Sequence, residues 1–131
     1  MKDILYKELC YDIVGICFKV QGQLGRFCKE KQYADEFEKL LMERKINYKR
    51  EFLLDNLDSN DIKGNRVDFI INDSLLIDFK SKKFITKEDY GQMQRYLRSA
   101  DLKLGLLINF RETYLKPKRV INYEYDRIHN S

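Results

Sequence analysis

The chain has 131 residues and a formal net charge of +4, from 25 lysines and arginines against 21 aspartates and glutamates, and this small surplus permits a polyanionic partner without requiring one. We expect one domain over residues 1–131 in a reducing cytoplasm, because the three cysteines form no C-x-x-C pair and no apolar run reaches the roughly 20 residues of a membrane span. The single histidine, His129, argues against a histidine-based triad or metal site, so any catalysis must depend on carboxylates, lysines, tyrosines or amides.

Two helices are predicted in the first part of the chain. Apolar residues recur at helical spacing from Ile4 to Val20, and we expect Gly22 and Gly25 to end that helix. A second helix is predicted from Phe27 to Lys45. Its expected inward-facing residues are Phe27, Tyr33, Phe37, Leu40 and Leu41, with Met42 as a further candidate.

After the second helix the pattern changes to short strands. Tyr48–Leu54 alternates loosely, and a polar loop rich in Asp, Asn and Ser follows over residues 55–64. Two apolar runs, Arg66–Ile71 and Leu75–Phe79, are separated by Asn72-Asp73-Ser74 and predict a β-hairpin. Both runs are apolar at successive positions, so we expect a sheet that is covered on both faces.

A third helix and a last strand complete the predicted fold. Thr86 and Asp89 have the spacing of a capping box, which predicts a helix that begins there and ends near Ser99. Leu102–Phe110 is typical of a buried strand, and the tail from Arg111 is basic and aromatic. This order of elements predicts a mixed α/β domain.

Asp78 and Lys80 are the first candidate site residues. Two positions apart on one strand, their side chains project from the same face of the sheet. The Asp-x-Lys spacing alone means little, since it recurs at Asp101 and Lys103. What distinguishes this copy is Asp68, which also lies among apolar neighbours on the preceding strand, where a charge is costly unless it is paired or bound to a metal.

The register of the hairpin decides whether the two aspartates meet. A two-residue loop pairs Ile71 with Ser74 and puts the aspartates on opposite faces, whereas a three-residue loop pairs Ile71 with Leu75 and sets Asp68 across from Asp78. We predict the three-residue loop. Two carboxylates at such a short distance repel each other unless a cation lies between them, and an all-oxygen site suits Mg²⁺ or Mn²⁺. With a lysine nearby, this set is typical of metal-assisted phosphodiester hydrolysis.

Asp68, a hairpin and then Asp78-x-Lys80 resemble the PD-(D/E)xK nuclease superfamily, and the chain resembles more narrowly its small bacterial and archaeal GxxExxY proteins. The matching stretches cover nearly the whole chain in the family's order: Glu8–Gly25, Glu30-x-x-Tyr33, Asp68, Asp78-x-Lys80, Gln92-x-x-x-Tyr96-Leu97 and Leu104–Phe110. The resemblance implies a restriction-endonuclease-like α/β fold, in which a central mixed sheet of four or five strands is flanked by helices.

The resemblance also implies a role for each candidate residue. Asp68 and Asp78 would bind Mg²⁺ or Mn²⁺, and Lys80 would position the attacking water. Glu30 would add a metal ligand or a base, and Gln92 would support the site or the substrate. Gly25 lies five residues before Glu30 instead of the family's three, so we expect a longer turn before the second helix.

Basic and aromatic residues that follow the proposed site could contact nucleic acid. The candidates are Lys82, Lys83, Arg95 and Tyr96. Two other interpretations carry equal weight: the basic residues form a solvated surface, and the tyrosine packs in the core.

The leading hypothesis is a Mg²⁺-dependent nuclease that acts on DNA. One alternative is a non-catalytic nucleic-acid-binding or assembly module on the same scaffold, which would bind with salt dependence but without regard to Mg²⁺. Another is a protein-interaction subunit beside a partner enzyme, with no affinity for nucleic acid. The sequence leaves open DNA or RNA, endo- or exonuclease action, and whether a homodimer or a partner protein supplies specificity.

Overall fold

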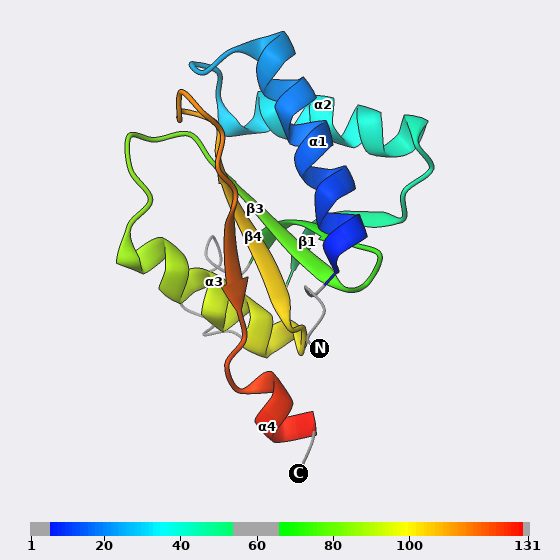
Figure 1. Cartoon of the computed structure of the whole chain (residues 1–131), viewed down its shortest axis with the longest axis vertical. Coiled ribbons are helices and arrows are strands. Elements are labelled where there is room, and N and C mark those ends of the chain that lie inside the picture. The colour runs from blue at the N-terminus through cyan, green and yellow to red at the C-terminus, as the bar shows by residue number, and fades with distance from the viewer. Residues whose placement is uncertain (1–5, 54–65, 130–131) are drawn as a thin grey trace.

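The computed structural model describes residues 6–53 and 66–129 (Figure 1). The predicted polar loop over residues 55–64 lies outside the described residues. In chain order the elements are α1 (Lys7–Leu24), α2 (Glu30–Glu43), β1 (Tyr48–Leu53), β2 (Arg66–Ile71), β3 (Leu75–Lys80), α3 (Lys87–Ala100), β4 (Leu104–Asn109), β5 (Lys118–Ile121) and α4 (Tyr125–His129).

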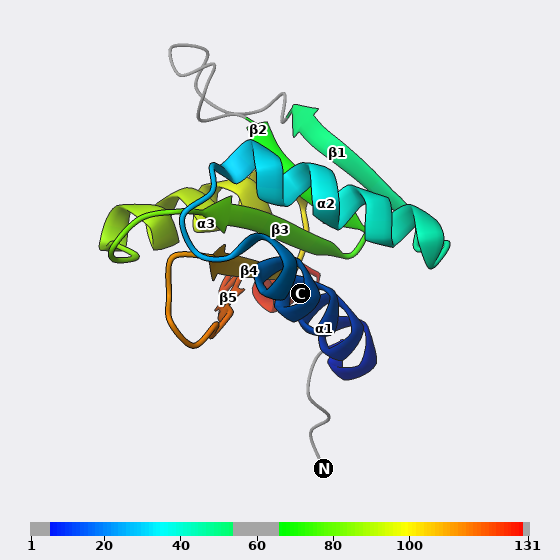
Figure 2. The ribbon, with the colours of Figure 1, turned by 90° about the horizontal axis from the view of Figure 1, so that it is seen from above.

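A five-stranded mixed sheet forms the centre of the fold, with strand order β1-β2-β3-β4-β5. The pairs β1–β2, β2–β3 and β4–β5 are antiparallel, and β3–β4 is parallel because α3 connects the two strands. Helices α1 and α2 pack together over one face, while α3 covers the other (Figures 1 and 2). The predicted α/β architecture and the prediction that both faces are covered are therefore confirmed.

The two faces hold separate apolar clusters because successive residues of the strands point in opposite directions. Phe79 packs against Phe37 of α2, with ring centroids 5.1 Å apart. Leu76, on the other face of β3, belongs to the cluster that contains Met93 and Leu97 of α3. Within the described residues, no helix is both long enough and apolar enough to cross a membrane.

The connection between α1 and α2 differs from the prediction. Helix α1 continues through Gly22 and ends at Gly25, whose φ of 79° places it in the region that favours glycine. The last turn is held because the Gln21 amide donates hydrogen bonds to the carbonyl oxygens of Phe110 and Glu112, at 3.0 and 2.8 Å. These bonds offset the roughly 1 kcal/mol that a glycine inside a helix costs relative to alanine.

Two residues that we expected to face inward on the second helix are exposed. Phe27 is 74% exposed and precedes α2, and the guanidinium groups of Arg26 and Arg111 each lie 5.1 Å from its ring centroid. Met42 is 63% exposed at the end of the helix. The other predicted inward-facing residues are buried, namely Tyr33, Phe37, Leu40 and Leu41.

Gly105 allows α3 to lie close against β4. A Cβ atom at this position would collide with the side chain of Met93. Gly105→Val should therefore lower the free energy of unfolding in urea by about 1–3 kcal/mol, and adding Met93→Ala should recover part of that loss. Gly15→Ala is the matched control, since a Cβ there meets no atom within 4 Å and alanine favours a helix. An equal loss with and without Met93→Ala would contradict this contact.

Candidate active site

The hairpin of β2 and β3 has the predicted register. Ile71 pairs with Leu75 and Phe69 with Ile77, so the loop has three residues, Asn72 to Ser74. Asn72 and Asp73 have φ values of 52° and 51°, a conformation that these two residue types tolerate better than most. The same register continued along the strands places Asp68 across from Asp78.

The two aspartates meet on the face of the sheet that α3 covers. Asp68 accepts a hydrogen bond from the backbone N–H of Phe79, at 2.7 Å, through its Oδ2 atom. Asp78 lies close enough that its charge and a side-chain hydrogen bond with it both raise the pKa of Asp68. A hydrogen bond between two carboxyl groups requires a proton on one of them.

The pKa of Asp68 is raised, which favours a proton on this carboxyl group at neutral pH. Burial raises the pKa of Asp68, the charge and hydrogen bond of Asp78 raise it further, and the Phe79 N–H opposes the shift only in part, so the pKa reaches about 8. The two carboxyl groups repel each other when both are ionised, and a divalent cation relieves that repulsion. Their oxygen atoms therefore fit a hard divalent cation, which would take the place of the proton.

Lys80 completes the group that we name the carboxylate–lysine site: Asp68, Asp78 and Lys80. Its Nζ atom lies 3.1 Å from Oδ2 of Asp78 and donates a hydrogen bond of 3.2 Å to Oε1 of Gln92 on α3. Burial lowers the pKa of Lys80, but Asp78 and more distant acids outweigh it and hold the pKa above its ordinary value. The side chain is therefore an ammonium at neutral pH, held between β3 and α3.

Asp89 is a further acid at this site, which the sequence analysis treated only as a helix cap. It does cap α3, since its Oδ2 accepts the Thr86 N–H at 2.8 Å, but it also forms an ion pair with Lys82 and lies 3.8 Å from Lys80. Burial alone would raise the pKa of Asp89, and the bonds from Lys82 and Thr86 reverse the shift and lower it. Its spacing of three from Gln92 is the signal that could have revealed it, because both face the sheet from one side of the helix.

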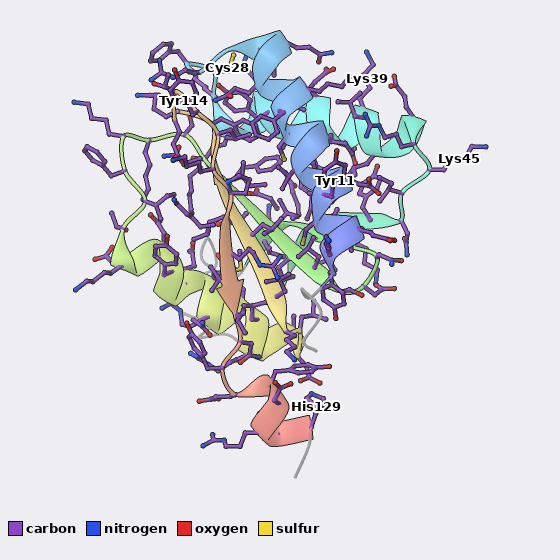
Figure 3. The ribbon with its side chains drawn as sticks, viewed as in Figure 1. Tyr11, Cys28, Lys39, Lys45, Tyr114 and His129 are labelled. Carbon is purple, nitrogen blue, oxygen red and sulfur yellow. The ribbon has the colours of Figure 1, made fainter. Side chains whose placement is uncertain are left out.

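Glu30 is the first residue of α2, and it is near enough to the end of β3 for the charges of Lys80 and Asp78 to act on it. The turn before it is held by Ser81, whose hydroxyl donates to the Cys28 carbonyl at 2.9 Å, and by Tyr33, whose hydroxyl donates to the Gly25 carbonyl at 2.6 Å. Figure 3 shows Cys28 at the same end of the molecule as Tyr114. Glu30 is exposed, but desolvation still raises its pKa, against the opposing charge of Lys80.

No three acidic, histidine or cysteine side chains of the described residues are close enough together to hold a metal ion. The acids that the structure brings into contact are Asp68 and Asp78, and Glu30 influences them through its charge. Such a pair suits Mg²⁺, which keeps several waters and uses one or two carboxylates.

A family model described as the PD-(D/E)XK nuclease superfamily matches residues 7–121. The chain belongs to the PD-(D/E)XK nuclease superfamily. The match runs from the start of α1 to the end of β5, so it includes the whole carboxylate–lysine site. PD-(D/E)XK nucleases generally use divalent metal ions, and the name of the superfamily implies a nucleic-acid substrate. Neither a curated protein nor a solved structure matched the chain.

The four residues that we predicted to bind nucleic acid have different environments. Lys83 and Arg95 are exposed, and Lys82 is partly exposed while paired with Asp89. Tyr96 is 2% exposed and packs with the apolar residues between α3 and the sheet. The prediction for Tyr96 is therefore wrong, because its ring is covered and cannot stack on a base.

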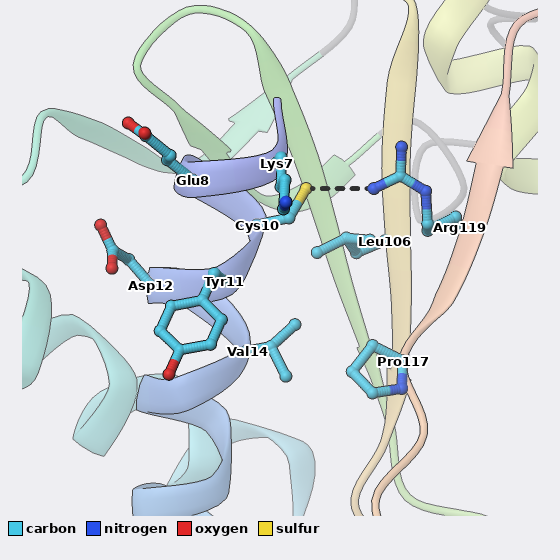
Figure 4. Close-up of a pocket in the computed structure, with 9 residues that line it drawn as sticks. All are labelled: Lys7, Glu8, Cys10, Tyr11, Asp12, Val14, Leu106, Pro117 and Arg119. Carbon is cyan, nitrogen blue, oxygen red and sulfur yellow. Dashed lines mark hydrogen bonds between the residues drawn. The ribbon is translucent and has the colours of Figure 1, made fainter. Parts of the chain in front are cut away.

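A separate pocket of about 640 Å³ lies between α1 and the β4–β5 pair (Figure 4). Its lining includes Tyr11, Val14 and Leu106, and Cys10 lies 3.5 Å from a guanidinium nitrogen of Arg119. Burial raises the pKa of Cys10, so this thiol remains protonated and is a poor nucleophile. The chemistry expected of a PD-(D/E)XK nuclease therefore points to the carboxylate–lysine site and not to this pocket.

Proposed function

We propose that this protein is a Mg²⁺- or Mn²⁺-dependent nuclease that hydrolyses phosphodiester bonds, with DNA as the leading substrate. The observation that supports this most strongly is the contact between the carboxyl groups of Asp68 and Asp78, with Lys80 3.1 Å from Asp78. An arrangement that forces a proton onto one of two neighbouring acids destabilises the fold, and such arrangements are typical of functional sites.

Asp68 and Asp78 would hold the divalent ion, and Glu30 would bind it directly or through water. When bound, such an ion supplies a water of lowered pKa and offsets negative charge on the phosphate. Asp68 would give up its proton when the ion binds, so that both carboxylates become ligands.

Lys80 would direct its ammonium toward the attacking water or a phosphate oxygen. Gln92 and Asp89 would act as positioning residues, since a hydrogen bond of 3.2 Å and an ion pair of 3.8 Å hold Nζ toward α3. A charge fixed in this way before the reaction stabilises the transition state without reorganisation.

We also propose that the chain is one of the GxxExxY proteins. The Glu30-x-x-Tyr33 stretch has a physical basis here, because Tyr33 is buried and its hydroxyl holds the turn that leads to Glu30. The longer turn expected from the position of Gly25 is present, and support for Glu30 as a site residue comes from the charges of Lys80 and Asp78, which are near enough to influence its pKa.

The test is hydrolysis of single- and double-stranded DNA and RNA by the purified protein with Mg²⁺, Mn²⁺ or EDTA. We expect cleavage only when a divalent ion is present. Activity that persists in both Asp78→Ala and Lys80→Ala would refute the assignment, and so would a wild-type protein that binds Mn²⁺ but cleaves none of the four substrates.

A further inference from the structure

A second pocket, of about 480 Å³, lies at the ends of β3 and β4, next to the carboxylate–lysine site. Asn109 connects the two, since it lines the pocket and pairs with Lys80 across the parallel strands. The amide of Asn109 also exchanges hydrogen bonds of 3.1 and 2.7 Å with the backbone of Lys82. Tyr90, another lining residue, directly follows Asp89, the partner of Lys80 and Lys82. The pocket and the site therefore share a wall.

Three aromatic side chains line this pocket without being buried. Phe84 is 76% exposed, Tyr114 is 79% exposed and Tyr90 is 37% exposed. They come from three segments: the loop after β3, the first turns of α3 and the β4–β5 loop. Aromatic faces that converge on one pocket and remain open to solvent are suited to stacking on a planar ligand such as a nucleobase, which contributes about 1–3 kcal/mol per base.

The charge of the same pocket is complementary to a polyanion. Lys83, Lys116 and Lys118 line it, against one acid, Glu112. Lysines interleaved with aromatic side chains offer phosphate contacts and base contacts side by side, as in sites that follow a single strand. A paired duplex would use only the lysines, because its bases are already stacked on one another.

We propose that the aromatic–lysine pocket, lined by Lys83, Phe84, Tyr90, Tyr114, Lys116 and Lys118, binds unpaired nucleotides of DNA or RNA. The bases stack on Phe84 and Tyr114, and the lysines contact the phosphates. The pocket then holds the strand beside the carboxylate–lysine site, and this last step rests on the proposed nuclease function. The substrate class that follows is a single strand or the unpaired part of a frayed or branched duplex.

The test is fluorescence anisotropy with the full chain in EDTA, so that binding is measured without turnover. The probes are a single DNA strand, the same sequence as RNA, and a blunt DNA duplex, each about 12 nucleotides long. We expect the single strands to bind at least about 10-fold more tightly than the duplex, and any difference between the DNA and RNA arms identifies the preferred sugar. Tyr114→Ala and Phe84→Ala should each weaken single-strand binding by about 5- to 100-fold.

Matched controls come from exposed residues outside the pocket. Tyr123→Ala removes a tyrosine that is 83% exposed and should leave binding unchanged. Lys116→Gln should reduce the slope of log affinity against log salt concentration by about 1, the value expected for the loss of one phosphate contact. Lys19→Gln on α1 should leave the slope unchanged. Every side chain substituted in these tests is exposed, namely Lys19, Phe84, Tyr114, Lys116 and Tyr123, so the substitutions should not affect folding.

The outcomes separate this inference from the proposed function. Equal affinity for duplex and single strands, or Tyr114→Ala and Phe84→Ala proteins that bind like Tyr123→Ala, would overturn the pocket assignment even if the protein cleaves DNA. Aromatic-dependent binding of single strands would support the assignment even if no cleavage occurs, and in that case the nuclease proposal would fail alone.

Discussion

Lys80→Met should remove most of the nuclease activity while divalent-ion binding is retained or becomes tighter. The ammonium lies 3.1 Å from Asp78, so it competes with any cation for the same carboxylates, and a neutral side chain of similar length removes that competition. Loss of a charge aimed at the reacting groups should lower the single-turnover rate by about 10²- to 10³-fold. Asp78→Asn should instead lose activity and ion binding together, because it removes a ligand.

The measurement combines Mn²⁺ titrations of the melting temperature with single-turnover hydrolysis on each variant. The chain provides its own control at Asp101 and Lys103, which repeat the Asp-x-Lys spacing but pair with His129 and Asp126, at 2.7 and 2.8 Å. Lys103→Met and Asp101→Asn should change neither readout. A Lys80→Met protein that loses Mn²⁺ binding would show that Lys80 holds the site together, and one that keeps full activity would exclude it from the chemistry.

Local signals were sufficient to predict the hairpin and the start of α3. The register of β2 and β3 followed from the alternation of side chains between the two faces of each strand. It also followed from a loop of Asn, Asp and Ser, residues that tolerate the turn conformation. The capping box at Thr86 and Asp89 is present because both partners belong to the same turn. These features depend on neighbours within a few residues, and such neighbours are visible in a sequence.

Features that depend on distant partners were not predicted. Strand β5 has only one buried residue, Val120, so it lacks an apolar pattern, and it is held by pairing with β4. Phe27 looks like the first apolar residue of a helix, but before the helix begins its exposed ring lies against the guanidinium group of Arg111, from a distant segment, as well as against that of its neighbour Arg26. In each case the deciding contact joins residues far apart in the chain.

The side of α3 that faces the sheet shows why a residue can have the predicted spacing and still not have the predicted role. Gln92 and Tyr96 are four residues apart, a spacing that places them on one side of the helix, and both do face the sheet. Gln92 lies opposite the end of β3 and reaches Lys80, whereas Tyr96 is one turn further along, over the apolar cluster with Met93 and Leu97. The spacing of residues along a helix determines which side of the helix each one is on. Which part of the sheet a residue then lies over depends on how the helix packs against the strands.

Divalent-ion affinity should rise with pH up to about pH 8, because Asp68 must lose its proton before it can act as a ligand. The pKa of Asp68 is about 8 in the folded protein against 3.8 for an ordinary aspartate, so between these values the folded state keeps a proton that the unfolded state has lost. Stability from this proton is complete below about pH 4 and is lost as the pH rises to about 8. Mn²⁺ replaces the proton, so its stabilising effect should grow over the same window, with up to about tenfold higher apparent affinity per pH unit.

Asp68→Asn provides the direct test, because an amide is neutral at every pH. In EDTA near pH 8 the variant should be more stable than the wild type, by about 1–2 kcal/mol in urea unfolding, since it no longer places two acids in contact. It should also gain almost nothing from Mn²⁺ at any pH. Asp12→Asn, an exposed aspartate on α1, should behave like the wild type in both measurements. A wild-type protein whose gain from Mn²⁺ is constant between about pH 5 and pH 9 would mean that Asp68 is already ionised, and the shared proton would have to be abandoned.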